Sequence, residues 1–310
     1  MIALCLTLLA GTPTLSLTAT VDAGKPKAGW VYAVAKQKVA LQAVLSDPKA
    51  RAKSWRWFKL EVASESVDNT QHGFHFEPIV FRAVEIEACR DQPACAADVT
   101  PSVLAKVEQL PGVGTMAFQV KATLDNGTEL ATPGLEAVKY GGLKPEVMRV
   151  TFRRDDSYLG FVSELVNTPY IFGSAGPDGR NQSDLLIGAD CADLAIYGRR
   201  RMGKKAEYTS SYAIDKQAPE RFRAVSSKDD GSVINAAGRP IIFGDKGVHV
   251  GDLIHFPGSR HVAVLYEDRP PLGVLDSGDL MIHTCWAPPK IEAIGSSSCG
   301  SFPWRLLRFP

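Results

Sequence analysis

The chain has 310 residues, of which 45% are hydrophobic and 22% are charged, and its formal net charge is +1. This length can build two domains with cores of their own, and the composition is typical of a soluble globular protein. A net charge close to zero gives no electrostatic reason to expect a nucleic acid or an anionic membrane surface as a partner. No stretch after the N-terminal segment approaches the roughly 18 apolar residues of a membrane span. We therefore expect neither a nucleic-acid partner nor a membrane span.

The N-terminal segment is apolar. Residues 1–10, MIALCLTLLA, resemble the hydrophobic part of a secretory signal, although the positive charges that usually precede it are missing. A buried first strand would account for the same pattern. We expect residues 1–14 to be a signal segment and the protein to be exported, to the periplasm or the extracellular space.

The first half of the chain has the pattern of short strands, in which apolar and polar residues alternate. The runs are 15–21, 39–45, 55–62, 80–86 and 116–124. The last run meets Asn126-Gly127 and returns through 128–131, and Asn-Gly between alternating runs is the strongest short-range hairpin signal. We expect residues 15–142 to form an immunoglobulin-like β-sandwich of antiparallel strands that acts as a spacer or a binding module.

The second half begins after a Gly/Pro-rich stretch at 141–145, so we expect a second domain over 143–310. Residues 156–166 have apolar residues at helical spacing after Asp156, a good N-cap, and predict an amphipathic helix. Another helix is predicted to begin at Cys191, with an acidic residue in its first turn and arginines in its last. A polar insertion, about 204–246, precedes strands that carry histidines. Helices followed by antiparallel strands indicate an α+β domain.

Cys191 is the candidate nucleophile. A thiol at a helix N-terminus meets the positive end of the helix dipole and unpaired backbone N–H groups, which favour the thiolate. We therefore expect iodoacetamide to alkylate Cys191 well below the pH that an ordinary thiol needs. The alternative is a small buried hydrophobic residue. His261, at the start of an apolar run, is the candidate base, and its alternative is a surface histidine at a turn.

Four blocks of the second half, in this order, resemble the NlpC/P60 family of papain-like cysteine peptidases. That family reads roughly PYxxGG, DCSG at a helix start, GDLxxF…HVGI and xIHA. The counterparts here are Pro169-Tyr170-Ile171-Phe172-Gly173, Asp190-Cys191-Ala192-Asp193, Gly251-Asp252-Leu253 with His261-Val262, and Ile282-His283-Thr284. The resemblance runs from about Arg149 to the end of the chain and implies a papain-like α+β fold. The family's Ser-Gly after the nucleophile is replaced by Ala192-Asp193.

The resemblance implies a role for each site residue. Cys191 would attack the substrate carbonyl, His261 would act as base, and His283 would orient the ring of His261. Asp279 is a rival for this orienting role. A further catalytic residue would be Tyr170, whose hydroxyl would complete an oxyanion hole, although a packing aromatic is as natural there.

Two carboxylates beside Cys191 are candidate substrate-binding residues. In the family pattern Asp190 helps to bind the amino end of the stem peptide, and it could equally be the N-cap of the helix. Asp193 would suit the helix dipole but would oppose a thiolate if it pointed inward. The replacement of the family serine by Ala192 puts this pocket in doubt.

The remaining cysteines predict two disulfides. Six cysteines, less Cys5 in the signal and Cys191, leave four, and the pairs Cys89–Cys95 and Cys285–Cys299 are the natural choice in an oxidising compartment. Four unrelated buried thiols are the alternative, in which case Cys285 would be a rival thiol near His283. No Cys-x-x-Cys or His-x-x-x-His spacing supports a zinc site, and no Walker pattern supports phosphate binding.

Together these observations predict an exported cysteine peptidase or amidase that needs no cofactor and no metal. Its substrate, by resemblance, would be a peptide of the cell wall: the stem peptide of peptidoglycan. The alternatives are a thiol-dependent acyltransferase or amidase on another substrate, or a non-catalytic wall-binding protein.

Overall fold

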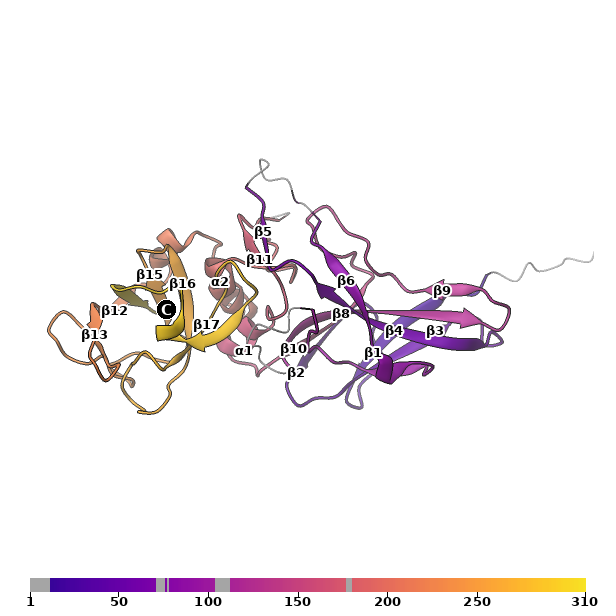
Figure 1. The fold of residues 1–310 in the computed structure, drawn as a ribbon, viewed down its shortest axis with the longest axis horizontal. Helices are drawn as coiled ribbons and strands as arrows, with labels where there is room; N and C mark the ends of the chain where they lie inside the picture. The colour runs from indigo at the N-terminus through magenta and orange to yellow at the C-terminus, as the bar shows by residue number, and fades with distance from the viewer. Residues whose placement is uncertain (1–11, 71–75, 77, 104–111, 177–179) are drawn as a thin grey trace, which may run out of the picture.

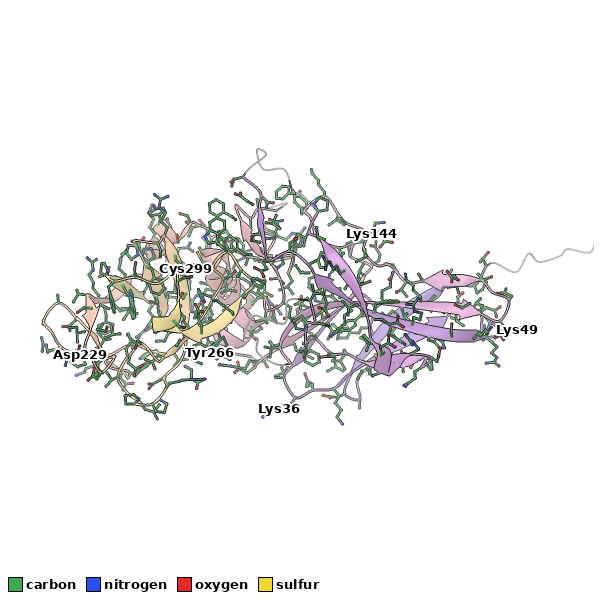
Figure 2. All side chains as sticks on the ribbon, in the orientation of Figure 1. Lys36, Lys49, Lys144, Asp229, Tyr266 and Cys299 are labelled. Carbon is green, nitrogen blue, oxygen red and sulfur yellow. A yellow bond between two sulfur atoms is a disulfide. The ribbon has the colours of Figure 1, made fainter. Side chains whose placement is uncertain are left out.

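The computed structural model describes residues 12–70, 76, 78–103, 112–176 and 180–310. Residues 1–11 of the predicted signal segment lie outside this part. The described chain is mostly β-strand, arranged in several sheets with few helices, and is therefore a mixed α+β structure (Figure 1). Charged side chains such as Lys36, Lys49 and Asp229 project from its surface (Figure 2). None of the helices in the described part is long and apolar enough to cross a membrane.

Two sheets build most of the first half. The smaller has the order β1-β3-β7, with strands Leu15–Val21, Val39–Leu45 and Ala94–Ala96. The larger has the order β2-β10-β8-β4-β6, with strands Trp30–Val34, Met148–Arg153, Gly114–Leu124, Ala52–Val62 and Phe81–Glu85. Alternate residues of both sheets meet in one apolar core, where Leu41 packs with Trp57 and Phe118. Both sheets bury one face against the other, as in a sandwich.

The Asn-Gly hairpin is confirmed. β8 and β9 (Glu129–Ala131) pair antiparallel around it, and the Asn126 side chain accepts a hydrogen bond from the backbone N–H of Thr128 at 3.0 Å. Gly127 has φ +83°, a backbone conformation that glycine adopts without steric cost.

Strand β10 extends the first-half sheet beyond the expected boundary at 142/143. It pairs parallel with β2 and antiparallel with β8, so the first half is not wholly antiparallel. Met148, Val150 and Phe152 point into the sandwich core, while Arg149 lines a cavity toward the second half. Because both faces of β10 are covered, the strand lacks the apolar/polar alternation that marks the other strands.

The second half is built on a six-stranded antiparallel sheet of order β12-β19-β15-β16-β17-β18. Its strands are Glu220–Ala224, Trp304–Leu307, Leu253–Phe256, His261–Glu267, Leu280–His283 and Lys290–Ala293. Helices α1 (Tyr158–Ser163) and α2 (Cys191–Arg201) share a core with one face of this sheet, to which Val262 and Val264 contribute. Ala263 and Leu265 pack into a core on the other face.

The polar insertion is part of this fold. It contributes the 3₁₀ helix η2 (Ser211–Lys216), the edge strand β12 and the short hairpin of β13 (Ser226–Ser227) and β14 (Val233–Ile234). Val233 and Ile241 are buried in the core on the face away from the helices. The insertion therefore covers the sheet rather than standing apart from it. Two further 3₁₀ turns, η1 (Glu87–Cys89) and η3 (Ile294–Ser296), complete the described elements.

Helix α1 is shorter than predicted, and its N-cap is not Asp156. The cap is Ser157, whose hydroxyl accepts a hydrogen bond from the N–H of Gly160 at 3.2 Å. Asp156 instead accepts a hydrogen bond from the guanidinium of Arg153 at 2.7 Å. Ser and Asp both cap helices well. The hydrogen bond with Arg153 occupies the Asp156 carboxylate, so Ser157 is the residue that caps α1.

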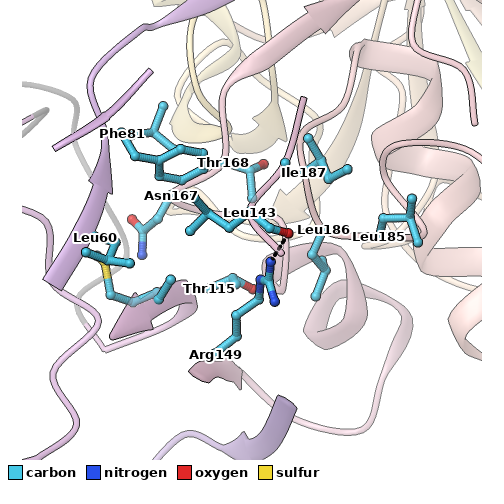
Figure 3. Close-up of a pocket in the computed structure, with 14 residues that line it drawn as sticks. Leu60, Phe81, Thr115, Leu143, Arg149, Asn167, Thr168, Leu185, Leu186 and Ile187 are labelled. Carbon is cyan, nitrogen blue, oxygen red and sulfur yellow. Dashed lines mark hydrogen bonds between the residues drawn. The ribbon is translucent and has the colours of Figure 1, made fainter. Parts of the chain in front are cut away.

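The two halves share structure. β5 (Ser66–Asp68) pairs parallel with β11 (Tyr170–Phe172), and a small apolar core joins Val62 and Ile79 to Ile171 and Ile187. Beside it lies a narrow cavity of about 40 Å³, lined from both halves (Figure 3). The first half therefore holds β11, the strand that carries Tyr170.

Arg149 closes this cavity. Its guanidinium donates a hydrogen bond to the backbone carbonyl of Leu143 at 2.6 Å (Figure 3). It also donates to the backbone carbonyl of Lys144 at 3.1 Å. Burial lowers the pKa of Arg149 to about 10, so the side chain stays protonated at neutral pH. It thus fixes the segment that joins β9 to β10.

Candidate active site

The predicted helix start at Cys191 is confirmed. Asp190 is the N-cap, and its Oδ1 accepts hydrogen bonds from the backbone N–H groups of Ala192 and Asp193, both at 2.8 Å. The N–H of Cys191 is not used by this cap and has no hydrogen-bond partner among the described residues. Cys191 as a residue is partly exposed, although its thiol is surrounded by protein.

The electrostatics of the thiol contradict the expected early alkylation. Burial, and then the carboxylate of Asp190, raise the pKa of the Cys191 thiol above its ordinary value. The backbone N–H groups of Val262 and Ala192 lower it, but they do not outweigh the first two effects. The helix start therefore holds a neutral thiol, which needs a base to become a nucleophile. The influence of Val262 also places the sulfur beside the backbone that follows His261.

The structure brings His261 and His283 together. His261 is the first residue of β16 and His283 the last of β17, and their rings face each other with His261 Nε2 2.8 Å from His283 Nδ1. Both rings are buried. In an antiparallel pair the first residue of one strand lies near the last residue of the other. The pairing of β16 with β17 therefore brings two histidines together that are far apart in the sequence.

Glu292 extends the pair into a chain of three side chains. Its Oε1 lies 2.8 Å from His283 Nε2, and Lys290 donates to its other oxygen at 2.5 Å. Burial opposes ionisation of Glu292, but the hydrogen bonds from His283 and Lys290 outweigh it and lower its pKa to about 2. Glu292 is therefore an ionised carboxylate, which can accept hydrogen bonds but cannot donate them. Sequence reasoning missed this residue, because only the pairing of β17 with β18 brings it to His283.

This chain sets the tautomers of both rings. A carboxylate at Glu292 requires the proton of a neutral His283 on Nε2, so His283 Nδ1 accepts. His261 must then carry its own proton on Nε2, which leaves Nδ1 with a lone pair. Burial, and then His283, lower the pKa of His261 to about 3, so its ring is neutral near pH 7. Nδ1 has no hydrogen-bond partner among the described residues.

The thiol and the imidazole approach from different sides of the sheet. The ring of His261 stacks on Phe256, with centroids 5.7 Å apart, and Phe256 belongs to the core on the face away from the helices. Cys191 borders the core on the helix side. In the described part of the chain no hydrogen bond joins Cys191 Sγ to His261. The two groups are neighbours at the end of β16 without being in contact as a pair.

Tyr170 lies beside the thiol. Burial raises the pKa of its hydroxyl, and so do the negative charges that Cys191 and Asp190 can carry, which indicates that all three groups are close. The hydroxyl has no hydrogen-bond partner among the described residues. The ring packs against Trp286, with centroids 5.0 Å apart. The geometry is compatible with both interpretations of Tyr170. Its ring packs against Trp286, and its hydroxyl has no hydrogen-bond partner that would prevent it from donating to an oxyanion.

Asp193 does not face an open pocket. It is buried, and its carboxyl accepts a hydrogen bond from the hydroxyl of Ser174. Burial, and then the charge of Asp190, raise its pKa well above the usual range, so it is held protonated. Asp190 is occupied as N-cap, and burial raises its pKa to about 6. Asp193 is therefore not free to bind the amino end of a peptide. Both cap bonds use only Oδ1 of Asp190, so its role in binding stays a prediction alongside the cap.

Asp279, the rival for orienting His261, serves another purpose. It is fully buried at the opposite end of β17 from His283, where it accepts hydrogen bonds from the backbone N–H groups of Arg269 and Asp276. These bonds hold the turn before β17.

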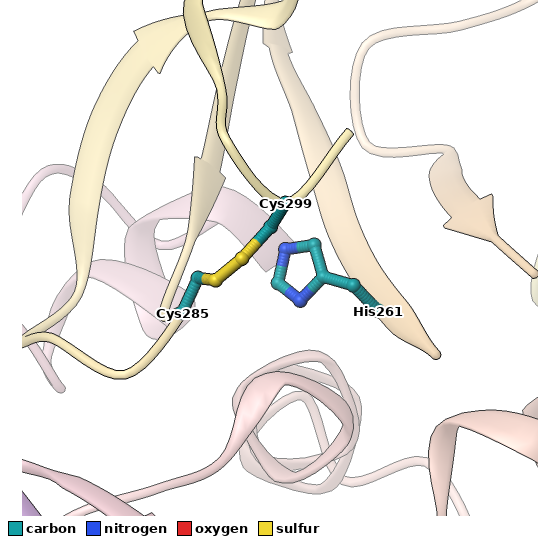
Figure 4. A group of neighbouring side chains, drawn as sticks. All are labelled: His261, Cys285 and Cys299. Carbon is teal, nitrogen blue, oxygen red and sulfur yellow. A yellow bond between two sulfur atoms is a disulfide. The ribbon is translucent and has the colours of Figure 1, made fainter. Parts of the chain in front are cut away.

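Both predicted disulfides are present, Cys89–Cys95 and Cys285–Cys299. The second lies against the ring of His261 (Figure 4), where the sulfurs and a ring nitrogen are within 4.8 Å of one another. Zinc is held by thiolates, and the sulfurs of a disulfide are not thiolates. With Cys285 paired, Cys191 is the only free cysteine among the described residues.

Comparisons with known proteins add nothing to this geometry: no family model, no curated protein and no solved structure matches the chain.

Proposed function

We propose that the protein is a thiol hydrolase that cleaves an amide bond through an acyl-enzyme, in a papain-like second domain that follows an immunoglobulin-like first domain. The chain Glu292–His283–His261 carries this proposal. It leaves a lone pair on His261 Nδ1, at the start of the strand whose next residue, Val262, lies beside the Cys191 thiol at a helix start. Its support is that this ordered chain of three side chains ends near the only free thiol of the described chain.

The reaction has two halves. Cys191 Sγ attacks the carbonyl carbon while His261 Nδ1 takes the thiol proton, and the oxyanion receives hydrogen bonds from the Cys191 N–H and the Tyr170 hydroxyl. The C–N bond then breaks, His261 protonates the leaving amine, and a thioester remains. Water attacks the thioester, its proton passes to Nδ1, and the acid leaves as the proton returns to the sulfur. A change in the Cys191 side-chain rotamer must bring Sγ to Nδ1, while His261 keeps its hydrogen bond to His283. Contacts of this kind are often loose without substrate.

The proposed substrate is the stem peptide of peptidoglycan, and the proposed location is outside the cytoplasm. The substrate rests on the sequence resemblance to the NlpC/P60 family. The location is supported by the two disulfides, which persist in oxidising compartments. The burial of Asp193 favours a second candidate, an amidase or acyltransferase on another substrate, because this carboxyl group does not face a pocket for a free amino end.

Digestion of purified peptidoglycan, followed by mass spectrometry of the released fragments, tests this function. The parent protein is expected to release peptide fragments, and Cys191→Ala, His261→Ala and His283→Ala are expected to release none. His249→Ala is the matched control, since this exposed histidine lies away from the thiol, and it should act like the parent. Equal release by the parent and Cys191→Ala would refute the proposed chemistry.

A further inference from the structure

A row of aromatic rings leads from the thiol to the surface. Trp286 lies between Tyr170 and Phe172, with ring centroids 5.0 Å and 5.5 Å away, respectively. Tyr170 is buried, whereas Trp286 is 58% exposed and Phe172 is 41% exposed. These three residues, called the aromatic row below, come from β11 and from the loop after β17. Large exposed aromatic side chains that adjoin a reactive group indicate a binding surface.

The aromatic row is held in place from both sides. Trp286 has φ +53°, a backbone conformation that costs a non-glycine residue on the order of 1 kcal/mol or more. Its neighbour Cys285 is tied to Cys299, and the Thr284 hydroxyl donates to the carbonyl of Ala287 at 2.6 Å across the same turn. The loop therefore presents the indole outward in a fixed orientation. The side chain of Trp286 is not buried, so packing does not offset this backbone strain. We therefore infer that the exposed face of the indole has a function.

The exposure indicates the chemistry of the ligand. No Lys or Arg of the described chain stacks on Trp286 or Phe172, so their free faces are not already covered by a cation. An apolar side chain is usually bound in a cavity that surrounds it. The aromatic row instead offers one open face. A pyranose ring fits this arrangement, because it can stack its C–H face on an indole while its hydroxyl groups stay in water.

We propose that the aromatic row is a sugar-binding subsite, which stacks on a pyranose ring of the glycan that carries the scissile peptide. The inference rests on the proposed function, because only an amide joined to a glycan would place a sugar ring next to the thiol. Tyr170 links the two sites, since its hydroxyl lies by Cys191 and its ring lies under Trp286.

Binding is tested without turnover. A tetramer of N-acetylglucosamine is titrated into Cys191→Ala protein by calorimetry, and into the same protein with Trp286→Ala. We expect the second change to weaken binding about five-fold or more, since an aromatic stack contributes about 0.5–1.5 kcal/mol beyond the area that it buries. Trp286→Phe should recover part of the affinity. Tyr212→Ala, which removes another exposed aromatic ring far along the chain, should leave it unchanged.

A kinetic comparison separates this subsite from the proposed reaction. Stem peptide joined to its disaccharide and the same peptide without sugar are compared as substrates of the parent and of Trp286→Ala. We expect Trp286→Ala to raise KM much more for the sugar-bearing substrate than for the peptide without sugar, whatever change in kcat the two substrates share through Tyr170. An equal rise for both substrates would assign the row to the peptide and overturn the sugar assignment, as would absence of tetramer binding. If neither substrate is cleaved but the tetramer binds through Trp286, the proposed amide cleavage is refuted and the proposed sugar-binding subsite is supported.

Discussion

At the scale of single residues, the site depends on where protons are held. Glu292 fixes the proton of His283, His283 fixes that of His261, and His261 is left with a lone pair on Nδ1. The thiol does not ionise by itself, because burial and Asp190 raise its pKa. Both the thiol and the imidazole of His261 are therefore neutral near pH 7, and in the proposed reaction the base would have to act during the attack. This differs from the preformed thiolate that a helix N-terminus alone predicts.

Glu292 is predicted to be a positioning residue. Glu292→Gln keeps the shape and an acceptor oxygen but removes the charge that stabilises a cationic His261–His283 pair. We expect kcat to fall by about 10- to 100-fold, as for other groups that orient a functional histidine. The rate should be measured from pH 4 to 9 along with thermal unfolding, and the loss should be present where stability is unchanged. Glu267→Gln is the control, because its carboxylate forms only an exposed pair with Arg269. Full activity of Glu292→Gln would contradict the role.

His261 is predicted to make stability pH-dependent. Its pKa is about 3 in the folded chain and about 6.5 in an unfolded one, so below pH 6.5 the unfolded state binds more protons. Its contribution is therefore complete above pH 6.5 and is lost as the pH falls toward 3. Asp190, with a pKa of about 6, acts in the opposite direction between pH 4 and 6. Urea unfolding at several pH values should show a smaller loss of stability in acid for His261→Gln than for the parent. An identical pH dependence for the two would exclude a depressed His261 pKa.

At the scale of elements, close packing of α1 on α2 sets the position of the thiol. Gly198 of α2 faces α1, and a Cβ built there would lie 2.4 Å from Val162 Cγ2 and 2.8 Å from Tyr158 Cε2. The Tyr158 hydroxyl also donates to the carbonyl of Ala195 at 3.0 Å. The absence of a side chain at residue 198 thus lets α1 support the helix that presents Cys191.

Gly198→Ala is predicted to destabilise the protein although alanine favours helices. The gain in helix propensity is about 1 kcal/mol, and overpacking of the contact costs about 1–3 kcal/mol, so we expect a net loss in the free energy of unfolding. Activity should fall as well if α2 shifts. Gly258→Ala is the control, because its new Cβ would lie 3.3 Å from the Ser301 hydroxyl, which can move. Denaturant titration measures both variants, and a stabilised Gly198→Ala would show that the helices can separate without cost.

At the scale of the whole molecule, the first half takes part in building the site. β5 of the first half pairs with β11, and Ile79 packs in one small core with Ile171 and Ile187. Tyr170, the first residue of β11, therefore depends on contacts that the first half provides. A spacer on a flexible linker would not have this connection.

Ile79→Ala is predicted to weaken both halves together. Removal of this buried side chain should cost about 2–5 kcal/mol, and the transition should stay single because the core is shared. Tryptophan fluorescence and far-UV circular dichroism, followed in the same urea series, should give coincident curves. Two separate transitions would show that the halves fold independently. Val44→Ala, at an exposed position of β3, is the control and should change stability little.

Much of the local structure was predictable from the sequence. Alternation identified β1 and β3, Asn126-Gly127 identified a hairpin, and the charge order around Cys191 identified the start of α2. Cysteine spacing identified both disulfides. These features depend on neighbours within a few residues, so the local sequence contains the information that specifies them.

The sequence by itself determined which residues could do chemistry: one thiol at a helix start and histidines at strand ends. Only the tertiary structure decided how they are used. Register between β17 and β18 brought Glu292 to His283, burial kept the thiol neutral, and loop packing placed Trp286 beside Tyr170. Charge state and contact depend on distance and dielectric in three dimensions, which a linear pattern of residue types does not specify.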